Sequence, residues 1–306
     1  MTVPASPATF PEFLPASVHG LTEATSMALA QQIQQVEVAT ELSYLPVATT
    51  YVRQGQGQPP FLLLHGFDSS ILEFRRLMPH LAGWRETWAV DLLGFGFTDR
   101  TITATISPAA IKQHIYDFWQ QEIQQPVVLV GASMGGAAAI DLTLTYPDIV
   151  NQLVLLDSAG LTAGPAMGRL MFPPLDRWAT AFLQTPRVRR RISRQAYADK
   201  SLVTADAELC GALHLECPDW SAALIAFTKS GGYNLSSDRV AQLTLPTLIL
   251  WGRQDRILGT KDAARFTQLL PRATLKWLED CGHVPHLEKP EATANQIRDF
   301  LENQKA

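Results

Sequence analysis

Short apolar segments alternate with longer amphipathic ones along most of this chain, and no other feature of the sequence restricts the fold as strongly. Seven segments are typical of strands: residues 47–52, 60–66, 86–94, 126–132, 152–159, 246–252 and 273–280. Several are apolar without interruption, as expected where helices cover both faces of a sheet. Five segments are typical of helices: residues 69–82, 107–123, 134–147, 261–271 and 290–303. The alternation predicts an α/β fold with a doubly wound, mostly parallel sheet.

Two parts of the chain lie outside this alternation. Residues 1–44 form an N-terminal extension, in which the spacing of apolar residues predicts an accessory helix over residues 21–38. Residues 159–236 contain no convincing strand and are rich in proline, arginine, methionine and aromatic residues. We expect them to form a helical cap inserted into a core made of residues 45–158 and 237–306.

The composition restricts the possible partners and compartment. A formal net charge of -4 argues against a general nucleic-acid-binding protein, which would carry a basic surplus. The three cysteines are widely spaced, so they suggest neither a disulfide framework nor a zinc site. The N-terminal sequence lacks the pattern of a secretory signal, and no uncharged stretch is long enough to span a bilayer. We therefore expect a cytoplasmic protein without a transmembrane segment.

The segment PVVLVGASMGGAAAI, residues 126–140, places Ser133 between a strand and a helix of small residues. GASMG matches the pattern GxSxG in the strand-to-helix context that this motif requires. Glycines two positions before and after the serine relieve steric crowding in so tight a turn. The pattern alone is common, so further residues must decide whether Ser133 is a nucleophile.

A serine nucleophile needs a histidine base and an acid that orients the histidine. Asp255 follows the strand at residues 246–252, and His283 follows the strand at residues 273–280. The carboxyl ends of parallel strands meet at one crevice, so we expect these side chains to converge on Ser133. Asp157, at the end of another strand, is the alternative acid. His286 is the alternative base, although we expect it to be structural.

With this order of serine, acid and histidine, residues 45–302 resemble the serine α/β-hydrolases that carry a cap. The resemblance implies that Ser133 is the nucleophile, His283 the general base and Asp255 the orienting acid. It also implies an oxyanion hole made by the backbone N–H groups of Met134 and Phe67. The segments HGFDSS and SGGYN together resemble a branch of this family from photosynthetic lineages, which implies no particular substrate.

Three further predictions concern residues near the expected crevice. We expect His65 to organise the loop after its strand, and Asp68 to cap the helix that follows or, less simply, to contact a polar substrate group. Aromatic residues of the cap favour a pocket for an apolar acyl or alkyl group, with Phe172, Trp178 and Tyr233 as candidate substrate-binding residues. Cys281, although close to His283 in sequence, is expected to be an inert buried thiol.

The leading functional hypothesis is a hydrolase of a carboxylic ester or related acyl compound. The alternatives are a hydrolase of a carbon–carbon bond in a vinylogous diketone, which would use the same three residues, and a hydrolase-like ligand receptor. No cofactor or metal is expected, because metal-binding patterns are missing and GFGFTD, residues 94–99, lacks the third glycine of a dinucleotide-binding loop. The natural substrate, acyl length and oligomeric state remain open.

Five arginines cluster in the segment PRVRRRISR, residues 186–194 of the expected cap. The simplest interpretation is a solvated helix face. The alternative is a surface that attracts anionic substrates or makes a weak contact with an anionic lipid surface.

Overall fold

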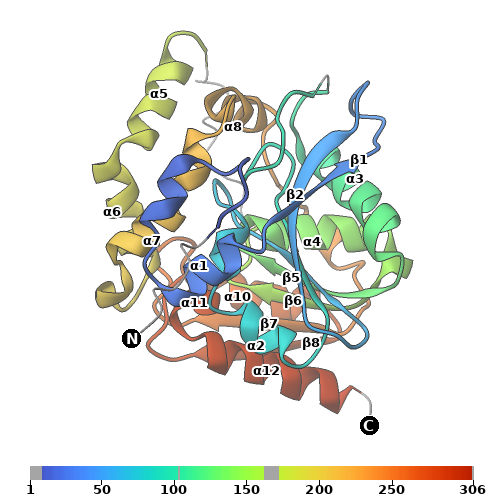
Figure 1. The fold of residues 1–306 in the computed structure, drawn as a ribbon. Coiled ribbons are helices and arrows are strands. Elements are labelled where there is room, and N and C mark those ends of the chain that lie inside the picture. The colour runs from blue at the N-terminus through green and yellow to red at the C-terminus, as the bar shows by residue number, and fades with distance from the viewer. Residues whose placement is uncertain (1–8, 103, 162–171, 305–306) are drawn as a thin grey trace, which may run out of the picture.

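An eight-stranded sheet forms the centre of the computed structural model, which describes residues 9–102, 104–161 and 172–304 (Figure 1). The strands are β1 (Gln34–Val38), β2 (Val47–Gln54), β3 (Phe61–Leu64), β4 (Thr87–Val90), β5 (Val127–Ala132), β6 (Val150–Leu156), β7 (Thr247–Gly252) and β8 (Ala273–Leu278). Their order in the sheet is β1-β2-β4-β3-β5-β6-β7-β8. β2 pairs antiparallel with β1 and β4, and the other pairings are parallel. The predicted α/β fold with a mostly parallel sheet is confirmed.

Two hydrophobic cores lie on opposite faces of this sheet, because successive residues of its inner strands point to alternate faces. In β5, Leu129 belongs to the core beneath helices α3 (Pro108–Phe118), α4 (Met134–Thr145) and α10 (Lys261–Leu269). Its neighbours Val128 and Val130 belong to the core beneath α2 (Met78–Ala82) and α12 (Pro290–Asn303). Helices therefore shield both faces of the sheet from water, which explains why the strand sequences show uninterrupted apolar runs.

The predicted helix over residues 21–38 is wrong in its second half. Helix α1 covers only Ala24–Ala30, and Gln34–Val38 form edge strand β1 paired with β2. The apolar residues Val36 and Val38 fit a two-residue period as well as a helical one, and pairing with β2 decides between the two. The N-terminal extension therefore contributes a strand to the sheet.

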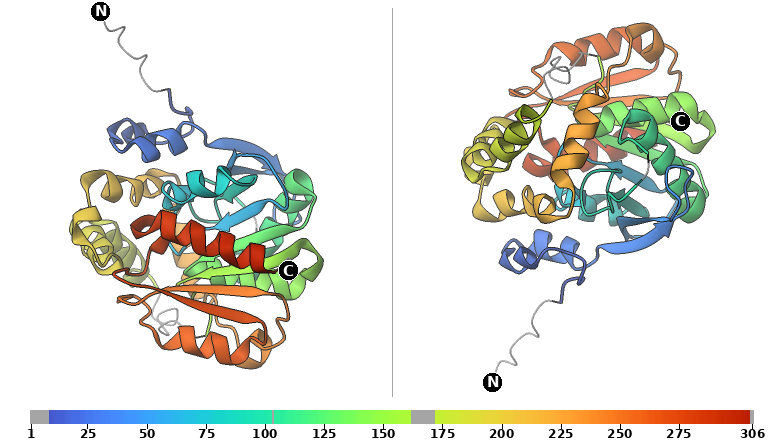
Figure 2. Two further views of the ribbon diagram at one scale, coloured as in Figure 1. Left: turned by 90° about the horizontal axis from the view of Figure 1, so that it is seen from below. Right: turned by 90° about the horizontal axis from the view of Figure 1, so that it is seen from above.

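Between β6 and β7, the described residues form helices and no strand. These helices are α5 (Leu175–Gln184), α6 (Pro186–Ala196), α7 (Ala205–Cys210), α8 (Trp220–Lys229) and α9 (Ser237–Val240). Helices α5, α6 and α7 lie together at one margin of the molecule, away from α3 and α12 (Figures 1 and 2). Residues 162–171 of the expected cap lie outside the described residues. No helix in the described part of the chain has the length and apolarity needed to cross a membrane.

The N-terminal extension is attached to this helical insertion through Asp206 of α7. Its carboxylate accepts hydrogen bonds from the backbone N–H groups of Thr22 (2.6 Å) and Glu23 (2.8 Å) and from the Ser26 hydroxyl (2.5 Å). Asp206 thus caps helix α1 from a distant segment, satisfying N–H groups that a helix start leaves without partners. Burial opposes ionisation of Asp206, but these donors outweigh it and lower the pKa of its carboxyl.

We predict that Asp206→Asn lowers the free energy of unfolding by about 1–3 kcal/mol at neutral pH, since hydrogen bonds to a charged acceptor are lost. Because folding lowers the pKa of Asp206, its stabilising effect is present above the ordinary carboxyl pKa and disappears as the pH falls below it. Urea denaturation at neutral pH and at acidic pH measures both effects. Asp148→Asn is the matched control, because Asp148 is exposed on the loop before β6. An equal loss in both variants would contradict the prediction.

Candidate active site

Ser133 lies in the sharp turn between β5 and α4 with a positive φ of 51°. The turn is possible only because Gly131 and Gly135, two residues before and after Ser133, have no side chains. A Cβ on Gly131 would lie 2.3 Å from the carbonyl oxygen of Gly135, and a Cβ on Gly135 would lie 2.1 Å from that of Leu64. The structure explains the two glycines of the motif by these close backbone approaches and directs the serine hydroxyl away from the sheet.

The structure brings Ser133, His283 and Asp255 together although they are far apart in the sequence. Nε2 of His283 lies 3.0 Å from Oγ of Ser133, and Nδ1 of His283 lies 2.9 Å from Oδ2 of Asp255. The other oxygen of Asp255 accepts hydrogen bonds from the backbone N–H groups of Ile257 and Leu258. Burial opposes ionisation of Asp255, but His283 and these N–H groups outweigh it, so the pKa of its carboxyl lies below its usual value.

Asp157, the alternative acid, lies beside this group with the opposite electrostatic behaviour. Its carboxyl accepts a hydrogen bond from the N–H of Gly252 (3.0 Å), and the histidine close to it, His283, is already bonded to Asp255. Burial and then the neighbouring charge of Asp255 raise the pKa of Asp157 well above its usual value. The pKa values of two adjacent carboxyl groups are therefore shifted in opposite directions, with Asp157 favouring its neutral form and Asp255 its charged form.

Asp157, Asp255 and His283 have potential metal ligand atoms within 4.8 Å of one another. However, both ring nitrogens of His283 already have partners in Ser133 and Asp255. A divalent cation would have to displace one of these contacts, and the raised pKa of Asp157 disfavours the charged form that would bind it. These contacts suit proton transfer better than metal binding.

Phe67 and Met134, the predicted oxyanion residues, lie on either side of Ser133. Met134 is the first residue of α4, and a Cβ on Gly66 would lie 3.4 Å from Cβ of Ser133, so the loop that carries Phe67 adjoins the serine. Neither backbone N–H donates a hydrogen bond to another described residue. Both N–H groups are therefore free to bind another group, and their role as an oxyanion hole stays a prediction.

His65 organises this loop, as predicted. Nε2 of its ring accepts a hydrogen bond from the N–H of Leu92, so Nδ1 carries the proton and donates to the carbonyl of Gly66 (2.8 Å). His286 also lies away from the serine, with Nε2 3.0 Å from Oε1 of Glu73.

Glu73 is a residue that the sequence analysis did not identify. It lies in a short helical turn, Ile71–Phe74, and its other carboxylate oxygen accepts the N–H of Gly66 at 3.0 Å. Burial opposes its ionisation, but His286 outweighs it and lowers the pKa of Glu73 to about 2. A buried carboxylate thus holds the residue before Phe67 in place. Its sequence context, SSILEFRR, resembles an ordinary surface helix and contains no signal of this role.

Asp68 does not cap the helix that follows, because its carboxylate binds side chains instead, and its contact with a polar substrate group stays a prediction. The residue has a positive φ of 51°, and its buried carboxylate binds three side chains of the helical insertion. Oδ2 accepts from Arg189 of α6 (2.5 Å), and Oδ1 accepts from Trp220 (2.8 Å) and lies 3.1 Å from Nε2 of His214. We name these four side chains the Asp68 clamp. It ties the residue after Phe67 to the insertion.

A second connection joins the insertion to the loop of His283. The backbone N–H of His283 donates to the carbonyl of Ala196 at the end of α6 (2.7 Å). Glu288 accepts from the N–H groups of Ala198 (2.7 Å) and Gly282 (2.5 Å). Both loops beside Ser133 are therefore fixed to the helical insertion, through contacts between segments far apart in the sequence.

A cavity of about 270 Å³ opens beside Ser133 and His283. Its walls come from the loop that carries Phe67, from α6 and from the loop of His283. The apolar residues in these walls are Phe67, Leu72, Ile192, Ala196, Ile257, Val284 and Leu287. The three predicted substrate-binding residues do not line it. Phe172 and Trp178 are exposed on the outside of the insertion, and Tyr233 packs into the core against Phe227. Cys281 is fully buried, and burial raises the pKa of its thiol.

Comparison with known proteins identifies the kind of protein that shares this arrangement. Residues 61–296 match the alpha/beta hydrolase family. The chain is 31% identical over 298 residues to the alpha/beta hydrolase domain-containing protein VTE7 of Arabidopsis thaliana, covering 95% of this chain and 90% of that protein. It is 25% identical to Lipase 1 of Psychrobacter immobilis, covering 79% of this chain and 76% of the lipase.

A different kind of hydrolase is about equally similar. The 2-hydroxymuconate semialdehyde hydrolase of Pseudomonas putida is 28% identical over 88% of this chain and 95% of its own length. Among solved structures, a meta-cleavage product hydrolase from Pseudomonas fluorescens superposes with a TM-score of 0.75 at 23% identity, covering 89% of this chain and 99% of that one. The structural likeness shows the shared fold.

We predict that the ion pair between Arg189 and Asp68 stabilises the fold far more than the ion pair between Arg190 and Glu208. Asp68→Ala would leave Arg189 and the other side chains of the Asp68 clamp buried without their acceptor, which should cost about 3–5 kcal/mol. Glu208→Ala, the matched control, removes the partner of the exposed Arg190 and should cost at most about 1 kcal/mol. Chemical denaturation of both variants measures the difference. Similar losses would show that the Asp68 clamp is not a buried anchor.

Proposed function

The chain belongs to the alpha/beta hydrolase family, and from this premise we propose that it is a serine hydrolase of a carboxylic ester or related acyl compound. The observation that carries the proposal is the continuous contact from Ser133 through His283 to Asp255, beside a cavity that Ser133, His283 and Phe67 line. This arrangement fits nucleophilic attack on a carbonyl carbon.

In the proposed reaction, Oγ of Ser133 attacks the substrate carbonyl while Nε2 of His283 accepts the serine proton. Asp255 stabilises the imidazolium that forms, because its carboxylate is ionised and bonded to Nδ1. The N–H groups of Phe67 and Met134 stabilise the oxyanion. His283 then donates the proton to the leaving alcohol. In the second half of the reaction, His283 accepts a proton from water, which attacks the acyl carbon, and returns that proton to Oγ of Ser133 as the acid leaves.

We further propose that residues 159–236 form a cap that shapes the acyl site. Helix α6 contributes Ile192 and Ala196 to the cavity wall opposite the oxyanion loop. Together with Val284 and Leu287 from the loop of His283, they favour an apolar acyl group. The reaction requires only groups of this chain and water.

The second candidate is hydrolysis of a carbon–carbon bond next to a ketone. Similarity to the 2-hydroxymuconate semialdehyde hydrolase of Pseudomonas putida favours it, since the two chains match over most of their length. The same serine, histidine and acid would serve.

A substrate panel distinguishes the candidates. We predict that the protein hydrolyses p-nitrophenyl esters of two to sixteen carbons and leaves a vinylogous diketone intact. Ser133→Ala should reduce ester hydrolysis by about 10⁶-fold, because the nucleophile is absent. Ser193→Ala is the matched control, since Ser193 lines the same cavity and no described histidine is bonded to its hydroxyl. Cleavage of the diketone alone would favour the second candidate, and cleavage of neither substrate would favour a receptor.

The two neighbouring carboxyl groups give a further prediction. Asp255→Asn should lower kcat for an ester by roughly 10⁴-fold, because the amide neither orients nor stabilises the imidazolium. Asp157→Asn should change kcat little, since the raised pKa of Asp157 favours its neutral form and an amide is also neutral. Steady-state kinetics of the two variants at pH 7 test this difference. If Asp157→Asn were the more damaging, Asp157 would be the acid.

A further inference from the structure

Helix α5 exposes large apolar side chains on one face. Leu175, Trp178 and Phe182 are 42%, 66% and 63% exposed. Their spacing of three and four residues places them on one arc of the helix. The opposite face packs against α8, where the Thr180 hydroxyl lies 2.7 Å from that of Ser221 and buried Asp176 binds Lys229. The exposed apolar arc is therefore not part of the hydrophobic core.

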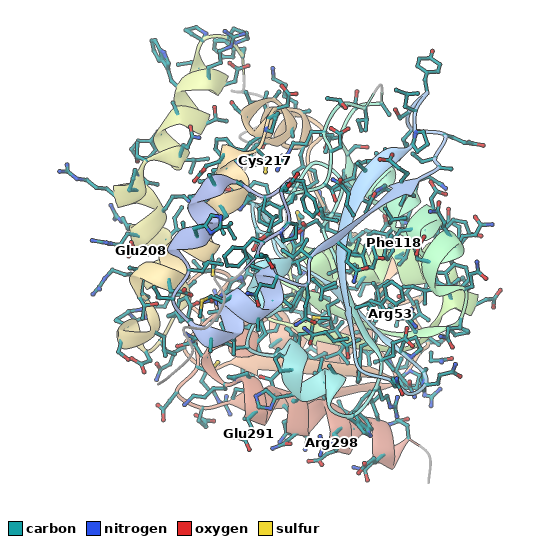
Figure 3. The ribbon with its side chains drawn as sticks, viewed as in Figure 1. Arg53, Phe118, Glu208, Cys217, Glu291 and Arg298 are labelled. Carbon is teal, nitrogen blue, oxygen red and sulfur yellow. The ribbon has the colours of Figure 1, made fainter. Side chains whose placement is uncertain are left out.

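Helix α6, which follows directly after Thr185, has two faces of different character. Its inner face contributes Arg189, Ile192, Ser193 and Ala196 to the cavity beside Ser133. Its outer face carries Arg187, Arg191 and Arg194, which are exposed and form no ion pair with any described carboxylate. The remaining arginines are neutralised, Arg189 by Asp68 and Arg190 by Glu208, which is labelled at this margin in Figure 3.

Charge is distributed unevenly in this part of the chain. From Leu175 to Ala196 the only acidic residue is Asp176, which is buried and paired, whereas the whole chain has a net charge of -4. Figures 1 and 2 show α5 and α6 together at the outer margin of the molecule. Two neighbouring helices therefore carry exposed apolar side chains and three unpaired cations on the exterior.

We propose that this surface binds the headgroup region of an anionic lipid bilayer. We name it the α5–α6 surface and define it by Leu175, Trp178, Phe182, Arg187, Arg191 and Arg194. Indole, phenyl and leucyl groups enter the boundary between headgroups and acyl chains, and arginines bind the anionic headgroups. A solvated helix face would account for the arginines but not for three adjacent exposed apolar side chains.

The position of the cavity gives this surface a function. One helix, α6, presents its outer face to the bilayer and its inner face to the cavity beside Ser133. Binding would place the cavity near the lipid–water boundary, where apolar esters concentrate. The inference concerns where the protein binds and stands independently of the reaction that Ser133 performs.

Sedimentation with vesicles tests the proposal. We expect Ser133→Ala protein, which cannot consume lipid, to bind phosphatidylglycerol/phosphatidylcholine vesicles and to bind phosphatidylcholine vesicles weakly or not at all. In that background, the triple variant Arg187→Gln, Arg191→Gln and Arg194→Gln should lower the partition coefficient by about 100-fold. The matched control is Lys261→Gln, Arg272→Gln and Lys276→Gln, which removes three exposed cations from α10 and the region of β8. Equal loss in the two triple variants, or equal binding to neutral vesicles, would overturn the proposal.

Fluorescence tests the apolar contribution. Brominated lipids should quench the tryptophan emission of the bound protein, and Trp178→Phe should remove most of that quenching. The double variant Trp178→Ser and Phe182→Ser should bind vesicles more weakly while remaining folded, as judged by circular dichroism. If sedimentation equilibrium instead showed a dimer of the Ser133→Ala protein that this double variant dissociates, the surface would be an interface between two copies and the proposal would be wrong.

Discussion

The backbone approach that allows the turn at Ser133 is the constraint on which the rest of the site depends. Gly135 lies against the end of β3 and Gly131 lies against Gly135, at distances that leave no space for a Cβ. This contact fixes the start of α4, and with it Met134, relative to the loop that carries Phe67. A serine with a positive φ is tolerated there because the surrounding sheet and helices hold it in place.

Buried carboxyl groups hold the loops around that turn. Each has different charged or hydrogen-bonding partners, which shift its pKa up or down. The pKa of Asp255 is lowered beside His283, while the pKa of its neighbour Asp157 is raised well above its usual value. Glu73 holds the loop before Phe67, and Asp68 joins the residue after Phe67 to the helical insertion. The insertion therefore helps to position the groups beside Ser133 in addition to covering them.

Local patterns in the sequence predicted the sheet, the order of the strands and helices along the chain, and the proximity of Ser133, Asp255 and His283. They failed where contacts between residues far apart in the sequence determine the local structure. Val36 and Val38 fit two periods, and only pairing with β2 makes them a strand. Glu73 and Asp68 look like surface residues because their partners, His286 and Arg189, are far along the chain. The sequence did not show whether the aromatic side chains of the insertion point into the cavity or into solvent, so the exposed position of Trp178 was not predicted.

The central claim is that Ser133 forms a covalent acyl intermediate with help from His283 and Asp255. The most direct measurement is mass spectrometry of the protein quenched in acid within the first turnover of an activated ester, followed by peptide mapping. The account predicts one added acyl group, on the peptide that contains Ser133, which disappears during a chase without substrate. An acyl group found on a different residue and turned over at the rate of the reaction would contradict it.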